Sequence, residues 1–239
     1  VRRGLQQRYG NAGRGMVFSY GLARSNGPHD YVSFSQNIWD GSRNVVTKDS
    51  LATGISGFSV TTNDSNPSVG ISLRNNEGID YKFNSVQVFY KPDSTGMTAS
   101  DSLEITEAVN PIKLATGIKE FRLLNYLSNC KIKINSDTSF ALFGLNLLND
   151  SSGVVYHNIG VNGAEYQSFL GQPLFFEQVP ELNADLYILS FGTNEAFAKN
   201  FDGTVFIQTV DSFIAKLRYV SPSASILITS PQESCKRIR

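Results

Sequence analysis

Hydrophobic and polar residues alternate along the middle of the chain, between residues 46 and 150. Within 130–134, Cys130, Ile132 and Ile134 occupy one set of alternate positions and two lysines occupy the other. The same period of two recurs in the runs 68–74, 84–90 and 140–148. Clusters of turn-forming residues separate the runs, at 63–67, 75–78 and 92–96. Such alternation is typical of half-buried strands, so we predict an antiparallel β-sandwich or jelly roll over 46–150.

The pattern changes after residue 150. The stretch ADLYILSFG (184–192) is almost continuously apolar, as expected for a parallel strand that is buried on both faces. Residues 204–220 place apolar side chains at helical spacing, and Asp202 just before them is a plausible cap. Further elements are expected as strands at 154–159 and 223–231 and a helix after the turn in 161–170. Strands and helices in this alternation predict a parallel sheet.

The start of the chain, VRRGLQQRYGN, is predicted to be helical and to end at a group of glycines. Residues 17–45 are rich in aromatic and turn residues without a helical period, which indicates a long structured connection over the surface. The expected organisation is therefore an α/β unit from 1–16 and 151–239, a connecting segment 17–45, and a sandwich 46–150. Because both ends look cut, we interpret the chain as an internal portion of a longer protein.

Composition narrows the function classes. The 21 basic and 21 acidic residues cancel, so the basic excess of a nucleic-acid-binding protein is missing. No stretch approaches the roughly 20 apolar residues that a membrane-spanning helix needs. The two cysteines, Cys130 and Cys235, lie far apart without metal-ligand spacing, and a disulfide between them is not favoured. We expect neither a metal nor a cofactor.

Two short motifs stand where predicted strands end. The first is NIGVNGA (158–164), and the second, about thirty residues later, is LSFGTNE (189–195). In open α/β sheets, ligands bind beyond the carboxyl ends of the strands. Both motifs are therefore predicted to lie at the ligand-binding edge of one sheet.

Together these motifs resemble the second and third sequence blocks of the SGNH/GDSL hydrolases. In addition, LQQRYGNAGRG (5–15) resembles the helix after the first-block serine in exported bacterial members, which carry a β-sandwich between the first two blocks. The resemblance implies an α/β fold, a partial SGNH-type three-layer parallel sheet, with an inserted all-β sandwich. It also implies an oxyanion hole formed by the backbone N–H of Gly163 and the side-chain amide of Asn194. Preorganised N–H donors of this kind stabilise the charge that develops on an acyl oxygen.

The sequence departs from the family pattern at the catalytic residues. It contains neither a Gly-Asp-Ser nor an Asp-x-x-His motif, so no catalytic nucleophile or base is assigned within these residues. The resemblance places the serine upstream and the aspartate and histidine downstream. Neither His29, in a surface loop, nor His157, in the predicted strand 154–159, matches the motif. Ser230 follows a predicted strand, but no Gly-x-Ser-x-Gly elbow surrounds it.

Three other residues are candidates for substrate binding. Glu195 either binds a substrate hydroxyl or orients the neighbouring loop, with capping of a helix start as the simpler alternative. Asn162 lies beside the proposed oxyanion glycine. Trp39 either stacks on a sugar ring or anchors its long loop to the body of the protein.

The leading hypothesis is a portion of a serine esterase that removes acetyl or other acyl groups from a carbohydrate polymer. The partner is then an acylated carbohydrate, and by family resemblance the protein is exported to the periplasm or cell surface. One alternative is a non-catalytic protein with a degenerate hydrolase fold, in which the sandwich 46–150 binds carbohydrate. Another is a structural protein with a vestigial fold. The sequence does not specify the acyl group, the glycan or the oligomeric state.

Overall fold

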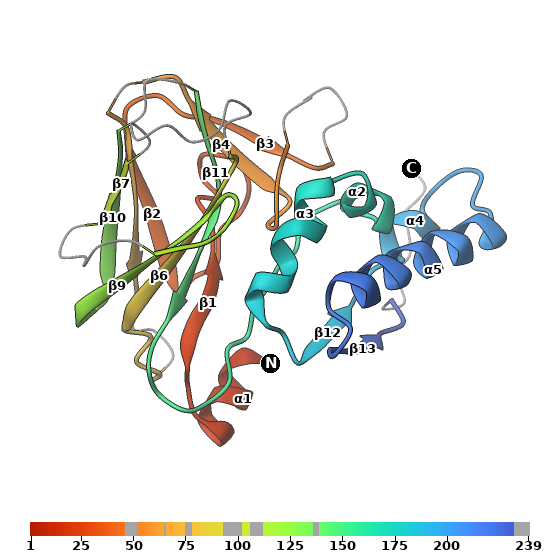
Figure 1. Ribbon diagram of the computed structural model, residues 1–239. Coiled ribbons are helices and arrows are strands. Elements are labelled where there is room, and N and C mark those ends of the chain that lie inside the picture. Colours follow the sequence, from red (N-terminus) through yellow and green to blue (C-terminus); the bar gives the residue numbers. More distant parts are fainter. Residues whose placement is uncertain are drawn as a thin grey trace.

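The computed structural model describes residues 1–45, 52–64, 66–74, 78–92, 102–105, 112–135 and 139–231. Most of the turn cluster at 75–78, most of that at 92–96, and Cys235 therefore lie outside the described residues. Within them, helices and antiparallel strands are combined in a mixed α/β architecture (Figure 1). No helix in these ranges is long and apolar enough to cross a bilayer.

Antiparallel strands make up the first two thirds of the described chain. The larger sheet has the order β3-β4-β11-β6-β9-β8, with β1 also paired to β11. Its strands are β1 (Gly13–Val17), β3 (Asp40–Arg43), β4 (Phe58–Thr62), β6 (Phe83–Tyr90), β8 (Ile112–Ala115), β9 (Ile118–Leu127) and β11 (Phe140–Leu148). The smaller sheet has the order β2-β5-β10-β7. Its strands are β2 (Tyr31–Gln36), β5 (Ser68–Leu73), β7 (Ser102–Ile105) and β10 (Asn129–Asn135).

Both sheets contribute to one buried core. The predicted alternation in β10 is confirmed, since Cys130, Ile132 and Ile134 are buried while Lys133 is exposed. These side chains belong to the same hydrophobic cluster as Val86 of β6 in the larger sheet. Burial of this apolar surface is the main favourable contribution to the stability of the sheets.

The segment 17–45, expected as a connection over the surface, contributes two strands instead. β2 pairs with β5 and β3 pairs with β4, both antiparallel. The hydropathy pattern does not predict β2, because the less exposed face of this strand carries Tyr31 and two serines whereas Val32 and Phe34 point outward. Residues 13–17 also differ from the expectation, because they form β1 and pair antiparallel with β11.

The predicted N-terminal helix is present as α1 (Arg2–Tyr9). Its buried Gln6 donates hydrogen bonds to the carbonyls of Gly13 and Val154, at 2.9 Å each. A buried ion-pair network joins the same region, in which Asp30 accepts from both Arg2 and Arg14. Polar contacts therefore fix α1 against the larger sheet.

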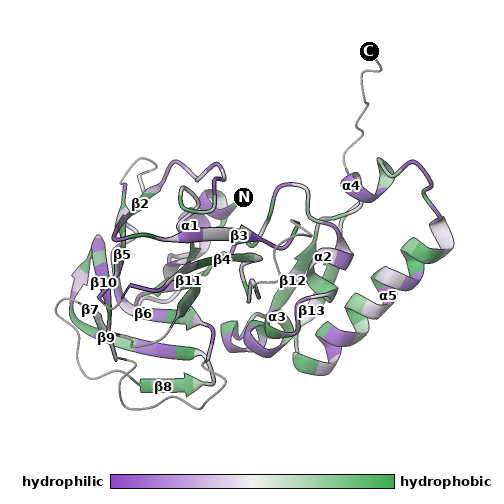
Figure 2. Ribbon diagram, turned by 90° about the horizontal axis from the view of Figure 1, so that it is seen from above, coloured by the Kyte–Doolittle hydropathy of each residue, from purple (hydrophilic) through white to green (hydrophobic). Residues whose placement is uncertain are grey.

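The last third of the chain contains the parallel pair that the sequence predicted. β12 (Leu186–Leu189) pairs in parallel with β13 (Ser225–Ile228), and α5 (Gly203–Val220) connects them. Asp202 caps α5, because its carboxylate accepts from the backbone N–H groups of Thr204 and Val205. The other helices are α2 (Tyr166–Leu170), α3 (Pro173–Gln178), the 3-10 helix η1 (Val179–Leu182) and α4 (Thr193–Ala196). Figure 2 shows α5 with hydrophobic and hydrophilic residues alternating along it, as the spacing predicted.

Two expectations for this region are wrong. The strand at 154–159 is absent; only Val154 forms an isolated bridge, with Asn11, and the rest is irregular. Moreover, β12 is not buried on both faces, since Leu186 is 47% exposed and Ile188 45% exposed. Leu227 pairs with Ile188 in register and is also exposed, so one face of the parallel pair presents apolar side chains.

Helix α3 joins the parallel pair to the antiparallel sheets. The side chain of Gln178, at the end of α3, accepts from the backbone N–H of Ile55 at 3.0 Å and donates to the carbonyl of Tyr90 at 3.4 Å. Gln178 is only 1% exposed, so both hydrogen bonds are shielded from water. The position of η1, which follows directly, is thereby fixed relative to β6.

Candidate active site at the carboxyl edge of β12

The first motif forms a tight turn before α2. The backbone N–H of Ala164 donates to the carbonyl of Val161 at 3.0 Å, which closes a turn over 161–164. Gly163 has a φ of +87°, a conformation that favours glycine at this turn position. Apart from atoms of Gly163 and its two chain neighbours, no heavy atom of the described residues lies within 4 Å of the point where a Cβ would stand. The backbone at Gly163 therefore faces open space, and a ligand could approach it closely.

The second motif leaves β12 and enters α4. Gly192 is the N-cap residue with a φ of +107°, and Asn194 follows in the first turn of the helix. The side-chain Nδ2 of Asn194 donates to the backbone carbonyl of Ala164 at 2.8 Å. A primary amide nitrogen carries two hydrogens, so one is held by Ala164 and the second remains for another acceptor. The structure thus brings Asn194 next to the residue that follows Gly163.

Glu195 connects the two motifs a second time. One carboxylate oxygen accepts from the backbone N–H of Tyr166 at 2.9 Å, and the other accepts from that of Gly192 at 3.0 Å. These N–H groups belong to the starts of α2 and α4, where unpaired donors and the helix dipole favour a negative charge. Glu195 therefore caps helix starts, as the simpler interpretation of the sequence had it. Because both oxygens are engaged, Glu195 also orients the loop of the second motif relative to the first.

Aromatic side chains pack together next to the two motifs and stabilise their arrangement. The ring of Tyr166 packs against Phe191 with a centroid separation of 4.6 Å, and against Phe213 of α5 at 5.4 Å. Burial, with a smaller contribution from Glu195, raises the pKa of Tyr166 above its usual value. Neither Tyr166 nor Phe191 was singled out from the sequence, because nothing in a single sequence distinguishes a supporting aromatic from an ordinary core residue.

The other candidate binding residues lie in different surroundings. Asn162 is exposed in the turn beside Gly163. Trp39 is only 8% exposed, belongs to the hydrophobic core, and donates from its indole N–H to the carbonyl of Gln36. Its burial favours the anchoring role over stacking on a sugar. Ser230 is exposed just beyond β13, and no hydrogen bond links it to a histidine among the described residues.

The two histidines lie in different surroundings. The Nδ1 atom of His157 accepts from the backbone N–H of Met16 at 3.3 Å, a long-range bond to β1. Burial, reinforced by the charge of Arg14, lowers the pKa of His157 to about 4. His29 is exposed in its loop. Cys130 is a free, buried thiol whose pKa burial raises to about 12, so it is unsuited to nucleophilic chemistry.

The described residues contain no group of three or more histidine, cysteine, aspartate or glutamate side chains that could hold a metal ion. At the carboxyl edge of β12, the motifs offer hydrogen-bond donors. These donors are the backbone N–H of Gly163 and the second Nδ2 hydrogen of Asn194.

Comparisons with known proteins give one informative match. Neither a family model nor a curated protein matches this sequence. A solved peptidoglycan O-acetylesterase structure matches 95% of this chain with a TM-score of 0.74 and 22% identity. The chain spans 60% of the length of that structure. At this identity the likeness shows a shared fold. A family two carbohydrate esterase from Cellvibrio japonicus matches 84% of this chain and 79% of its own at 12% identity, but its TM-score of 0.24 carries no argument.

Proposed function

We propose that this chain is a portion of an SGNH-type serine esterase that removes acetyl or other acyl groups from a carbohydrate polymer. In the proposed reaction, a serine oxygen attacks the acyl carbon and negative charge develops on the carbonyl oxygen. The backbone N–H of Gly163 and the side-chain amide of Asn194 donate to that oxygen. Loss of one such donor typically raises the barrier by about 2.7–4 kcal/mol.

The observation that carries the proposal is the hydrogen bond from Asn194 to Ala164. It holds the amide beside the Gly163 turn while leaving one Nδ2 hydrogen unused. Glu195 adds support, since it ties the same two loops through the N–H groups of Tyr166 and Gly192. A pair of donors held in place before the ligand arrives is what electrostatic stabilisation of an oxyanion requires.

In this proposal the nucleophilic serine and the catalytic aspartate and histidine lie outside this sequence, because the sequence contains neither a Gly-Asp-Ser nor an Asp-x-x-His motif. The proposal also treats the antiparallel sheets, whose strands run from β1 to β11, as a domain inserted into an SGNH-type parallel sheet to which β12 and β13 belong. Export to the periplasm or cell surface belongs to the same proposal. Acetylated peptidoglycan is the first polymer to test, since the structure with the shared fold is named for it.

The test uses the complete reading frame that contains this chain. Release of acetate is measured from acetylated peptidoglycan and from p-nitrophenyl acetate. We expect Asn194→Ala to lower kcat about 100- to 1000-fold with a smaller effect on KM. The matched control is Asn200→Ala, at an exposed asparagine six positions later. An Asn194→Ala enzyme as active as the wild type would remove the oxyanion assignment.

A further inference from the structure

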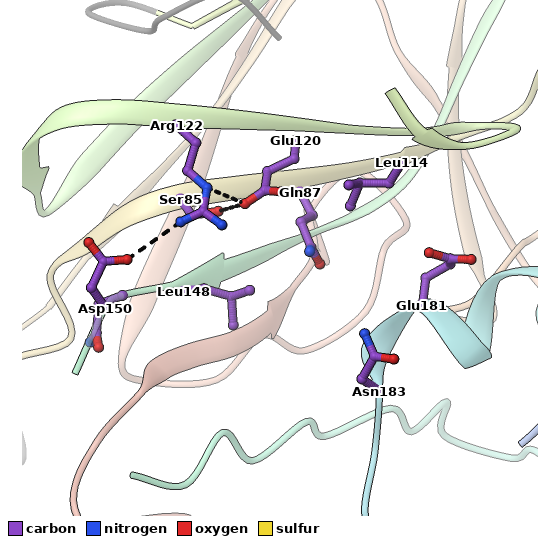
Figure 3. A pocket seen from close by; sticks show the side chains of 10 residues that line it. Ser85, Gln87, Leu114, Glu120, Arg122, Leu148, Asp150, Glu181 and Asn183 are labelled. Carbon is purple, nitrogen blue, oxygen red and sulfur yellow. Dashed lines mark hydrogen bonds and ion pairs between the residues drawn. The ribbon is translucent and has the colours of Figure 1, made fainter. Parts of the chain in front are cut away.

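A cavity separates the outer face of the larger sheet from η1 (Figure 3). Its volume of about 390 Å³ lies in the lower part of the range typical for small-molecule sites. It is distinct from the candidate active site, because η1 precedes β12 whereas Gly192 and Asn194 follow it. The two sites thus lie beyond opposite ends of β12, which itself spans about 13 Å.

The floor of the cavity is a grid of polar side chains set by strand register. Ser85 pairs with Arg122, and Gln87 pairs with Glu120, across β6 and β9. Since residues two apart on a strand point to the same face, all four side chains project together. Burial of two of them is unusual for the outer face of a sheet, with Ser85 2% exposed and Glu120 6% exposed.

Glu120 is held in a fixed orientation with one oxygen unused. Its Oε1 accepts from the hydroxyl of Ser85 at 2.7 Å and pairs with the Arg122 guanidinium at 2.7 Å. Its Oε2 has no partner among the described residues. Glu120 lines the cavity, so a ligand hydroxyl that enters it can donate to this oxygen.

The side chains on the opposite wall of the cavity are also available to a ligand. Glu181 and Asn183 line the cavity from η1 and the residue that follows it, and their side chains make no hydrogen bond within the described chain. The hydrogen bonds of Gln178 to Ile55 and Tyr90 fix this wall against the sheet. The cavity is thus bounded by two walls whose separation is set by the fold.

The available groups define the ligand. Free acceptors are present on Glu120 and Glu181, and free donors on Gln87 and Asn183. A saccharide hydroxyl both donates and accepts, so it can use such a mixture. Three carboxyl groups against one guanidinium disfavour an anion, and the described residues include no cluster suited to a metal ion. Only Leu114 and Leu148 are apolar, which disfavours a hydrophobic ligand.

We propose that this cavity binds an uncharged saccharide unit, as a second carbohydrate site remote from the candidate active site. The choice of a saccharide rests on the cavity's own donors and acceptors. We infer that the cavity holds one part of a polymer chain while the active site deacylates another part of the same chain. This role rests on the proposed function.

The test titrates the complete protein that contains this chain with three neutral trisaccharides, tri-N-acetylchitotriose, cellotriose and xylotriose, by calorimetry and NMR. We expect at least one to bind, and Glu120→Gln to raise its Kd at least about ten-fold. Because Glu120 is buried and that variant could unfold, Glu181→Gln and Asn183→Gly provide the same test at partly or fully exposed positions. Glycine at 183 tolerates the left-handed φ of +47° found there. Asp211→Asn, an exposed change of equal charge on α5, should bind like the wild type.

Three outcomes would overturn the inference. They are no binding by any of the trisaccharides, binding that none of the cavity variants weakens, and binding of trilysine in place of the sugars with the same variant dependence. The result is separable from the esterase test. Hydrolysis of p-nitrophenyl acetate needs no saccharide in this cavity, and saccharide binding needs no catalytic serine.

Discussion

The side-chain amide of Asn194 is hydrogen-bonded at 2.8 Å to the backbone carbonyl of Ala164, thirty positions earlier in the chain. We expect Asn194→Ala to lower the free energy of unfolding of the 239-residue chain by about 1 kcal/mol, the usual net value of one hydrogen bond. Asn194→Asp should cost more, about 1–3 kcal/mol, because a carboxylate oxygen would then face the carbonyl. Urea denaturation measures both. Equal stability of the Ala and Asp variants would show that the bond does not form in solution.

The Glu195 carboxylate accepts from two backbone N–H groups, those of Tyr166 and Gly192. In Glu195→Gln one of these donors would face an amide NH2, so we expect a loss of about 1.5–3 kcal/mol. Glu177→Gln, at an exposed position on α3, serves as the comparison. Hydrogen exchange should show faster exchange at Tyr166 or Gly192 in Glu195→Gln. Unchanged exchange at both amides would contradict the bridging role.

Asp30 lies between Arg2 and Arg14 and is only 3% exposed. Asp30→Asn would leave the buried guanidinium of Arg14 without a counter-charge, so we expect a loss of about 3–5 kcal/mol. The exposed pair of Asp80 and Lys82 provides the control, since Asp80→Asn should change stability by no more than about 1 kcal/mol. Thermal unfolding distinguishes the two. A small effect at Asp30 would mean that its ion pairs contribute no more than surface ones.

His157 has a pKa lowered to about 4, against an ordinary value of 6.5. Between these two values the unfolded chain binds more protons than the folded one. Stability attributable to His157 is therefore complete above pH 6.5, and it is lost as the pH falls from 6.5 towards 4, by about 2–3 kcal/mol. Unfolding measured across this range should show the slope. His157→Asn keeps an acceptor for the Met16 N–H but cannot titrate, so its slope should be flatter.

The 239-residue chain alone should not hydrolyse p-nitrophenyl acetate above background. Oxyanion donors without a nucleophile and a base leave little catalysis. A spectrophotometric assay at neutral pH is sufficient. Turnover that disappears on Ser230→Ala would refute the prediction and identify that exposed serine as a nucleophile.

Much of the fold could be predicted from local patterns. The strand faces of β10, the cap of α5 at Asp202, and the order β12, α5, β13 follow from period, capping and chain order. The strand β2 could not be found, because Val32 and Phe34 lie on its more exposed face. Its place in the smaller sheet comes from pairing with β5, which is a long-range relationship that hydropathy does not contain.

The candidate site was predictable only in part. Gly163 and Asn194 were found through motifs at strand ends, and the structure brings their loops together through Ala164. The strand expected before Gly163 is nevertheless absent, since within 154–159 only Val154 forms a bridge, with Asn11. No sequence motif predicts the proposed saccharide cavity. Ser85, Glu120 and Glu181 come from separate elements and converge only through register and helix placement.

The attachment of α1 has a consequence for the order in which the chain folds. Gln6 is bonded to Val154, 148 positions away, and β1 pairs with the end of β11. During synthesis, therefore, Gln6 can contact Gly13 early, but its bond to Val154 cannot form until residue 154 has been made. Contacts of such long range close large loops and slow folding. We expect α1 to be among the last of the described elements to become protected from exchange during refolding.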